Sequence, residues 1–155
     1  MNKISNKLVV FDFDGVICDS TNECMVTAWN AWERWNGRTD FRNNIEFFNA
    51  KETELFRGLR PYVRGAGEYY LVMRIIHSNK PYISNQKEYD DLLKKEKQFI
   101  EPFKETFYKE RERLRKCSIS DWISLHIIYE DVIKVVRNLH KQKRLIVATL
   151  KDKES

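Results

Sequence analysis

Hydrophobic and polar residues follow two different patterns along the chain, and together these patterns predict an α/β fold. Residues 7–13 form a short apolar run with β-branched and aromatic side chains, which is typical of a buried strand. Residues 144–149 have the same character near the other end of the sequence. Most of the stretch between them carries apolar residues at helical spacing. Strand, helices and strand is the order of a parallel sheet, so we expect the two strands to pair in parallel.

Residues 20–141 are expected to form a series of helices. The first helix follows a cluster of N-cap residues, Asp19, Ser20 and Thr21, and ends before Gly37, which suits a C-terminal cap. We expect Pro102 to break or kink a long charged helix, because proline removes a backbone donor. The later helices are expected to begin at Asp40, Pro61, Ser84, Ser120 and Glu130.

The change of pattern along the chain predicts two domains. Residues 1–18 and 127–155 are expected to form a partial α/β core, with a helical domain of residues 19–126 inserted into it. Two parallel strands with one crossover cannot cover their own faces or edges. We therefore expect the chain to be the front part of a longer protein. The isolated chain should self-associate through its exposed sheet edges or have a loose core beside the helical domain.

Composition indicates a soluble globular protein. Of the 155 residues, 42% are hydrophobic and 33% charged, a balance that excludes disordered chains. The longest apolar run, Leu8 to Phe11, is far shorter than the ~20 residues of a membrane span. Asp12 and Asp14 interrupt the segment where a signal peptide would stay apolar. The three cysteines show no CxxC spacing, so we expect a cytoplasmic protein with reduced thiols and no membrane partner.

The net charge of +5 raises the question of nucleic-acid binding. Much of the excess lies in helical runs such as residues 111–116, where glutamates are interleaved with arginine and lysine. Runs of mixed sign are usually solvated helix faces. Nucleic acid is therefore not an expected partner.

Candidate chemistry begins with Asp12 and Asp14, at the end of the first predicted strand. Side chains two residues apart share a face while the chain stays extended, and ligands bind at the carboxyl ends of strands in open α/β sheets. Two close carboxylates need a cation or a shared proton. The pair therefore suits an aspartyl nucleophile beside an acid/base carboxylate, with Mg²⁺ balancing the charge.

The aspartate pair has two alternative interpretations. An EF-hand loop needs an oxygen ligand at position 5 and glycine at position 6, where this chain has Val16 and Ile17. The second interpretation makes Asp12 and Asp14 turn formers only, because Asp-Gly after a strand is a common turn. The wider sequence around the pair favours the chemical interpretation.

The ten residues from Phe11 to Ser20, FDFDGVICDS, resemble the FDxDGVxxDS signature of the haloacid dehalogenase-like hydrolase superfamily. Leu145 to Thr149, LIVAT, resembles the second motif of that superfamily, a strand that ends in serine or threonine. The predicted helical insert occupies the position of the superfamily's helical cap. The resemblance implies a Rossmann-like hydrolase core, here only its first strands, with a helical cap inserted after the first strand.

The resemblance also implies roles for individual residues. Asp12 resembles the nucleophile that forms an aspartyl-phosphate, and Asp14 resembles the acid/base that protonates the leaving oxygen and then activates water. Both residues are implied ligands of Mg²⁺, Asp14 through its backbone carbonyl. Thr149 resembles the residue that hydrogen-bonds the transferring phosphoryl group.

The sequence departs from the superfamily pattern after the second motif. The lysine of the third motif and the acidic pair of the fourth normally come on later strands, which this sequence does not contain. Lys151 lies close enough to Thr149 to be a candidate phosphate ligand. Its alternative interpretation is an exposed lysine at the start of a helix.

Arg60 and Arg64 are the candidate substrate-binding residues of the helical domain, because arginine binds phosphate and carboxylate in a bidentate manner. The alternative, which we prefer, is a basic helix end balanced by Glu52, Glu54 and Glu68. The three histidines share no metal-ligand spacing. We expect four aromatic residues to belong to the core: Trp29, Trp32, Phe47 and Phe48.

These features predict a Mg²⁺-dependent phosphatase that hydrolyses a small phosphate monoester, with phosphoglycolate phosphatases as the nearest analogy. Asp14 favours phosphatase or phosphomutase chemistry over dehalogenation, since only the former needs a proton on the leaving oxygen. Two alternatives stay open. One is a phosphomutase of the same superfamily, and the other is a truncated, non-catalytic binding or interaction module.

Overall fold

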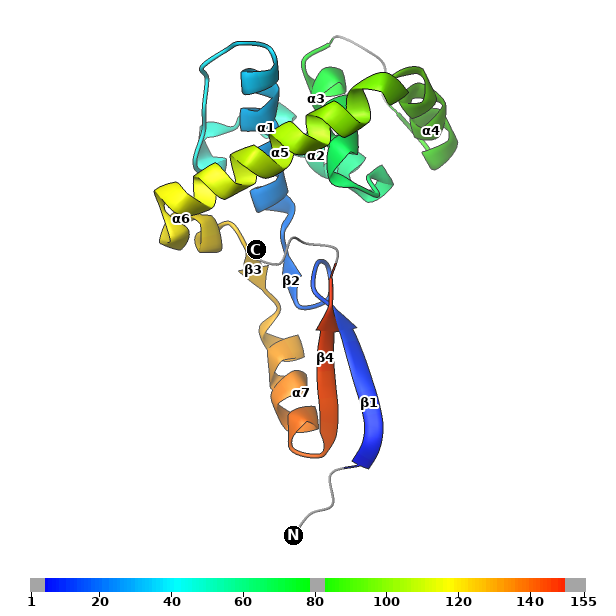
Figure 1. Ribbon diagram of the computed structural model, residues 1–155, viewed down its shortest axis with the longest axis vertical. Coiled ribbons are helices and arrows are strands. Elements are labelled where there is room, and N and C mark those ends of the chain that lie inside the picture. Colours follow the sequence, from blue (N-terminus) through cyan, green and yellow to red (C-terminus); the bar gives the residue numbers. More distant parts are fainter. Residues whose placement is uncertain (1–4, 79–82, 150–155) are drawn as a thin grey trace. The chain divides into compact units, whose positions relative to one another are not determined.

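The computed structural model describes residues 5–78 and 83–149 (Figure 1). The chain divides into two compact units. The first, here the α/β unit, comprises Met1–Ser20 and His126–Ser155. The second, here the helical unit, comprises Thr21–Leu125.

The α/β unit is built on two parallel strands, β1 (Ser5–Asp12) and β4 (Lys143–Ala148). The predicted parallel pairing is therefore confirmed. In the register of the pair, Val9 lies opposite Leu145, and Asp12 lies opposite Ala148. Asp12 ends β1 one residue earlier than expected, because the chain turns at the next residue.

Helix α7 (Glu130–His140) packs against β4 within the same unit, where Figure 1 shows it running alongside the strand. A second, two-residue pairing was not predicted: β2 (Cys18–Asp19) is antiparallel to β3 (Ile127–Ile128). Strands of two residues are too short to show alternation, so the hydrophobic pattern could not reveal them. The order of the described elements makes this unit α/β, as expected.

The helical unit consists of helices and short 3₁₀ turns. Its elements are α1 (Thr21–Trp35), η1 (Ile45–Phe47), α2 (Ala50–Leu59), η2 (Arg60–Tyr62), η3 (Ala66–Glu68), α3 (Tyr69–Ile76), α4 (Gln86–Lys95), α5 (Lys97–Cys117) and α6 (Ile119–Ser124). Stacked rings join three of these helices, since Tyr69 lies parallel to Phe56 at 5.7 Å and to Phe107 at 5.0 Å. The described part of the chain contains no helix long and apolar enough to cross a membrane.

The first helix follows the prediction closely, and Gly37 ends it as expected. Gly37 has φ +66°, the left-handed conformation that glycine adopts without strain. Its N–H donates to the carbonyl of Arg34, and the N–H of Arg38 donates to that of Glu33, the two bonds of a Schellman cap.

The helix predicted from Asp40 does not form. The Asp40 carbonyl accepts a hydrogen bond from Trp29 Nε1 at 2.9 Å. The Asn30 amide binds both the N–H and the carbonyl of Arg42, at 2.8 and 2.6 Å. Side chains of α1 therefore hold this segment open, and α2 begins instead after the N-cap Asn49. Phe47, expected in the core, is 63% exposed, whereas its neighbour Phe48 is buried.

The helix predicted from Pro61 begins only at Tyr69. Gly67 explains part of the delay, because a Cβ at this position would lie 2.3 Å from the carbonyl oxygen of Ile100. The preceding segment thus packs its backbone directly against α5.

The long charged helix breaks at Glu96 and not at Pro102. Pro102 is exposed near the start of α5, and the helix continues through it with Phe103 and Phe107 fully buried. Losing one hydrogen bond to proline is offset by keeping this aromatic face in the core. The caps of the two flanking helices also differ from the prediction: Asn85 precedes α4, and Ser118 precedes α6.

Candidate functional site

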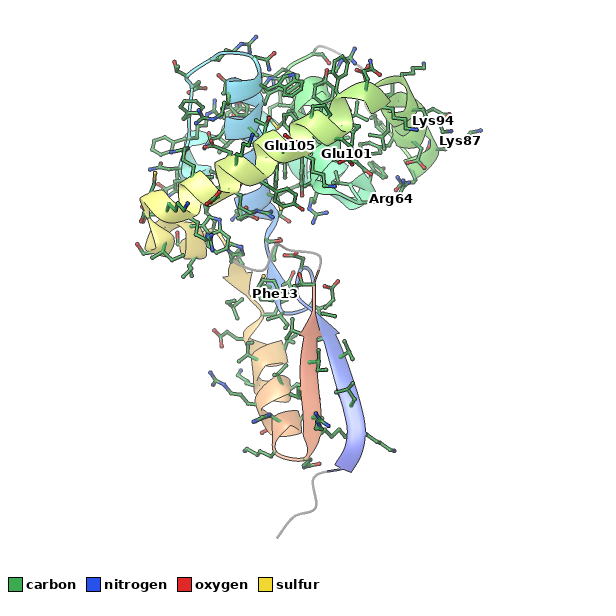
Figure 2. The ribbon with its side chains drawn as sticks, in the orientation of Figure 1. Phe13, Arg64, Lys87, Lys94, Glu101 and Glu105 are labelled. Atoms are coloured by element: carbon green, nitrogen blue, oxygen red, sulfur yellow. The ribbon has the colours of Figure 1, made fainter. Side chains whose placement is uncertain are left out.

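A tight turn follows β1 and places the residues of the FDFDGVICDS motif. The carbonyl of Phe13 accepts hydrogen bonds from the N–H groups of Ile17 at 2.9 Å and Cys18 at 3.2 Å. Gly15 has φ +77°, which favours glycine, and its N–H donates to the Cys18 carbonyl at 2.7 Å. Figure 2 shows Phe13 at this turn.

Asp12 and Asp14 are held by different parts of this turn. Asp12 is exposed at the end of β1, and its Oδ1 accepts a hydrogen bond from the Phe13 N–H at 2.7 Å. Asp14 is half-buried, forms an isolated bridge with Cys18, and accepts a hydrogen bond on Oδ1 from Ser20 Oγ at 2.6 Å. Because extension ends at Asp12, the turn rather than strand alternation sets the position of Asp14.

Thr149 belongs to the same edge of the sheet as Asp12. The register pairs Asp12 with Ala148, so Thr149 follows directly after the residue opposite Asp12. Its side chain is exposed. Carboxyl ends of parallel strands are the usual place for ligands in α/β sheets. Lys151 lies outside the described residues.

Arg60 and Arg64 belong to the helical unit. Arg64, which is labelled in Figure 2, binds both carboxylate oxygens of Asp90 through Nη2, at 2.5 and 2.7 Å. Its backbone N–H donates to Glu68. A hydrogen bond from Gln86, followed by the Arg64 guanidinium, lowers the pKa of the Asp90 carboxyl group. The guanidinium of Arg60 faces the ring of Tyr69 at 5.9 Å.

The acidic partners of these arginines differ in part from the expected set. Glu52 forms a capping box with Asn49 and pairs with Arg42 at 2.9 Å. Glu68 contacts Arg64 only through the backbone N–H described above, while Asp90 is its ion-pair partner. The balancing carboxylate for Arg64 thus comes from α4, a helix that the local sequence around Arg64 does not contain.

The donor chemistry at the end of β1 suits a hard cation. Asp12 and Asp14 offer carboxylate and carbonyl oxygens, the ligands that Mg²⁺ prefers. Within residues 5–78 and 83–149, no group of three or more His, Cys, Asp or Glu side chains is arranged to hold a metal ion. Mg²⁺ commonly binds through one or two carboxylates and keeps several waters, so the two aspartates fit this cation.

The sequence alone predicts Ser20 only as a helix-capping residue. In the structure its hydroxyl contacts Asp14. The signal for this contact was present, because Ser20 is the last residue of the ten that resemble the superfamily signature.

Comparison with known proteins gives one family match. A family model described as a hydrolase, haloacid dehalogenase-like hydrolase, matches residues 6–155. The search of curated proteins and the search of solved structures gave no match. The matched range contains most of β1, the whole helical unit and β4.

Proposed function

The chain belongs to the haloacid dehalogenase-like hydrolase family, and we propose that it is a Mg²⁺-dependent phosphatase acting on a small phosphate monoester. The family match confirms the resemblance of the FDFDGVICDS motif. One observation carries the proposal beyond that match: Asp12 ends β1, Asp14 lies in the turn after it, and Thr149 directly follows β4, the strand that pairs with β1 in parallel. This edge supplies a nucleophile, a proton donor and a hydroxyl for the phosphoryl group.

In the proposed reaction, a carboxylate oxygen of Asp12 attacks the phosphorus atom. The new O–P bond forms as the bond to the leaving oxygen breaks, and protonated Asp14 gives its proton to that oxygen. Asp14, now a carboxylate, takes a proton from water as the water attacks the phosphorus atom of the aspartyl-phosphate, and the bond between phosphorus and the Asp12 oxygen breaks. Inorganic phosphate leaves, and both aspartates return to their initial states.

In this proposal, Thr149 and the cation stabilise the negative charge on the phosphoryl group. The hydroxyl of Thr149 donates a hydrogen bond to a phosphoryl oxygen in this proposal. Asp12, through its carboxylate, and Asp14, through its carbonyl, would hold Mg²⁺. When bound, the cation supplies positive charge that offsets the charge of the phosphoryl oxygens.

We assign the helical unit the role of a cap inserted after the first strand. Its position in the sequence supports this role, because Thr21–Leu125 lies between β1 and β4. Its own buried core also supports it, since a cap must stay folded while substrate enters and leaves.

The proposal is tested with a panel of phosphate esters and three proteins: wild type, Asp12→Asn and Asp91→Asn. Asp91 is an exposed carboxylate of α4 and serves as the matched control. We expect Asp12→Asn to lower kcat by about 10³-fold or more, as removal of a nucleophile does. Asp91→Asn should keep the wild-type rate, and chelation of Mg²⁺ should abolish it. Equal rates for wild type and Asp12→Asn would overturn the proposal.

A further inference from the structure

The hydroxyl of Ser20 makes a short hydrogen bond to the side chain of Asp14. Ser20 Oγ donates to Asp14 Oδ1 at 2.6 Å, and Ser20 is 3% exposed. Hydroxyl donors approach this closely when the acceptor is a carboxylate. This bond therefore fixes one of the two oxygens of the acid/base residue.

The backbone around Ser20 is anchored by the α/β unit. Cys18 and Asp19, directly before Ser20, form β2 and pair with Ile127 and Ile128 of β3. The carbonyl of Ile17 accepts a hydrogen bond from the Tyr129 N–H at 3.0 Å. Directly before this segment, hydrogen bonds from Ile17 and Cys18 to the Phe13 carbonyl hold the turn from Phe13 to Cys18. The backbone that carries the donor is thus held by its pairing with β3 as well as by the turn that contains Asp14.

We propose that Ser20 is the positioning residue of Asp14, an inference that rests on the proposed function. The hydroxyl of Ser20 can donate to Oδ1 whether Asp14 is ionised or protonated, because the proton of a carboxyl group sits on one oxygen only. The hydrogen bond therefore holds the Asp14 carboxyl group in one orientation while Asp14 gives its proton to the leaving oxygen and takes one back from water.

This role predicts that the fall in kcat caused by replacing Ser20 depends on the leaving group of the substrate. Ser20→Ala removes the donor, whereas Ser20→Thr keeps a hydroxyl. An alkyl phosphate needs its leaving oxygen protonated, but 4-nitrophenolate leaves without a proton. Ser20→Ala should lower kcat about 10- to 100-fold with the alkyl ester, as loss of a supporting partner does, and less than about threefold with 4-nitrophenyl phosphate. KM should change less than about twofold with either ester.

The experiment measures kcat and KM of the full chain with both esters for wild type, Ser20→Ala, Ser20→Thr and Ser118→Ala. Ser118 caps α6 in the helical unit and serves as a matched control. Ser20→Thr is expected to keep most of the alkyl-ester activity. Equal losses with both esters, or no loss in Ser20→Ala, would overturn the positioning role.

Failure of the proposed function gives a different result. A wild-type chain that hydrolyses neither ester contradicts the phosphatase proposal itself. Crystal structures of wild type and Ser20→Ala then decide the positioning role without activity. A rotated Asp14 carboxylate in the variant supports it, and an unchanged carboxylate contradicts it.

Discussion

The two units of this chain differ most in how completely they bury their apolar side chains. In the helical unit, Phe56, Phe103 and Phe107 are fully buried. In the α/β unit, none of the described side chains of β1 and β4 is buried, and Leu8 and Val10 are 51% and 55% exposed. The residues proposed for catalysis lie in the unit with the less complete core. The larger buried core and the residues proposed for catalysis thus belong to different units of the chain.

The two units also differ in the ion pairs and hydrogen bonds of their polar side chains. Within the helical unit, Arg111 on α5 binds both carboxylate oxygens of Glu23 on α1, at 2.8 and 2.9 Å, with both side chains buried. Thr27 adds a hydrogen bond to the same carboxylate at 2.8 Å. In the α/β unit, Asp12 accepts a hydrogen bond from the Phe13 N–H, and Asp14 accepts one from the Ser20 hydroxyl. We therefore expect substitutions to affect folding in one unit and turnover in the other.

The largest expected effect is that of Phe107→Ala in the helical core. Phe107 is fully buried and stacked on Tyr69, so its truncation leaves a cavity between α3 and α5. We expect the free energy of unfolding to fall by about 3–5 kcal/mol. Denaturant unfolding followed by tryptophan fluorescence measures it, and all four tryptophans of the chain lie in the helical unit.

Phe47→Ala is the matched control for that experiment. Phe47 is 63% exposed in the same unit, so its loss should change the free energy of unfolding by less than about 1 kcal/mol. Similar losses for the two variants would mean that the helical core is not closed around Phe107.

Arg111→Met has the next largest expected effect. It leaves the Glu23 carboxylate buried without its cation, which should destabilise the protein by about 3 kcal/mol. The double variant Glu23→Leu with Arg111→Met should regain most of this loss, because replacing both partners removes the uncompensated charge. Lys116→Met breaks an exposed pair with Glu112 and should change stability by about 0.5 kcal/mol or less. A double variant less stable than Arg111→Met contradicts this explanation.

Much of this architecture could be predicted from local sequence. The exceptions share one cause, which is contact with residues on another element of the fold. The two apolar runs predicted the parallel strands, and Gly37 marked the end of α1, because each depends on residues close in sequence. The helix expected from Asp40 failed because Trp29 and Asn30, on another element, hold the backbone there. The break at Glu96 rather than Pro102 depends on aromatic packing between α5 and α3.

In the candidate site too, local sequence predicts some features, and others depend on how the chain folds. The placement of Asp12 and Thr149 at one edge of the sheet follows from the two predicted strands, because the strands pair in parallel and each residue stands at or directly after a strand end. The contact of Ser20 with Asp14 spans six residues and depends on how the turn closes, which no periodic pattern encodes. The pairing of Arg64 with Asp90 spans 26 residues and required the packing of α4.

Alkaline pH should destabilise the helical unit through Cys24. Burial, and then the nearby Glu23 carboxylate, raises the pKa of the Cys24 thiol from 9.0 to about 11. The unfolded thiol therefore ionises near pH 9 while the folded thiol stays protonated. The contribution of the Cys24 thiol to the free energy of unfolding is complete below pH 9 and is lost as the pH rises towards 11. The total loss is about 2–3 kcal/mol. The free energy of unfolding, measured from pH 8 to 11, should show this fall.

Cys24→Ala should make that fall shallower, and the exposed Cys117→Ala should leave its slope unchanged. A smaller fall persists in Cys24→Ala, because burial also raises the pKa of Tyr69. An unchanged slope in Cys24→Ala would contradict the assignment to this thiol.

The smallest expected effect is that of Val10→Thr on the open face of β1. Threonine keeps the β-branched shape of valine and adds a hydroxyl, which water can reach at a position 55% exposed. We expect a change below about 0.5 kcal/mol, measured by hydrogen exchange of the β1 and β4 amides. The same substitution at Val72, fully buried in α3, should cost about 1–3 kcal/mol, because its hydroxyl enters the core of the helical unit. If Val10→Thr lowers the free energy of unfolding as much as Val72→Thr does, this face of β1 must be covered in solution. Self-association of the chain would then be measured as a molecular mass that rises with protein concentration, and Val10→Thr should lower that mass.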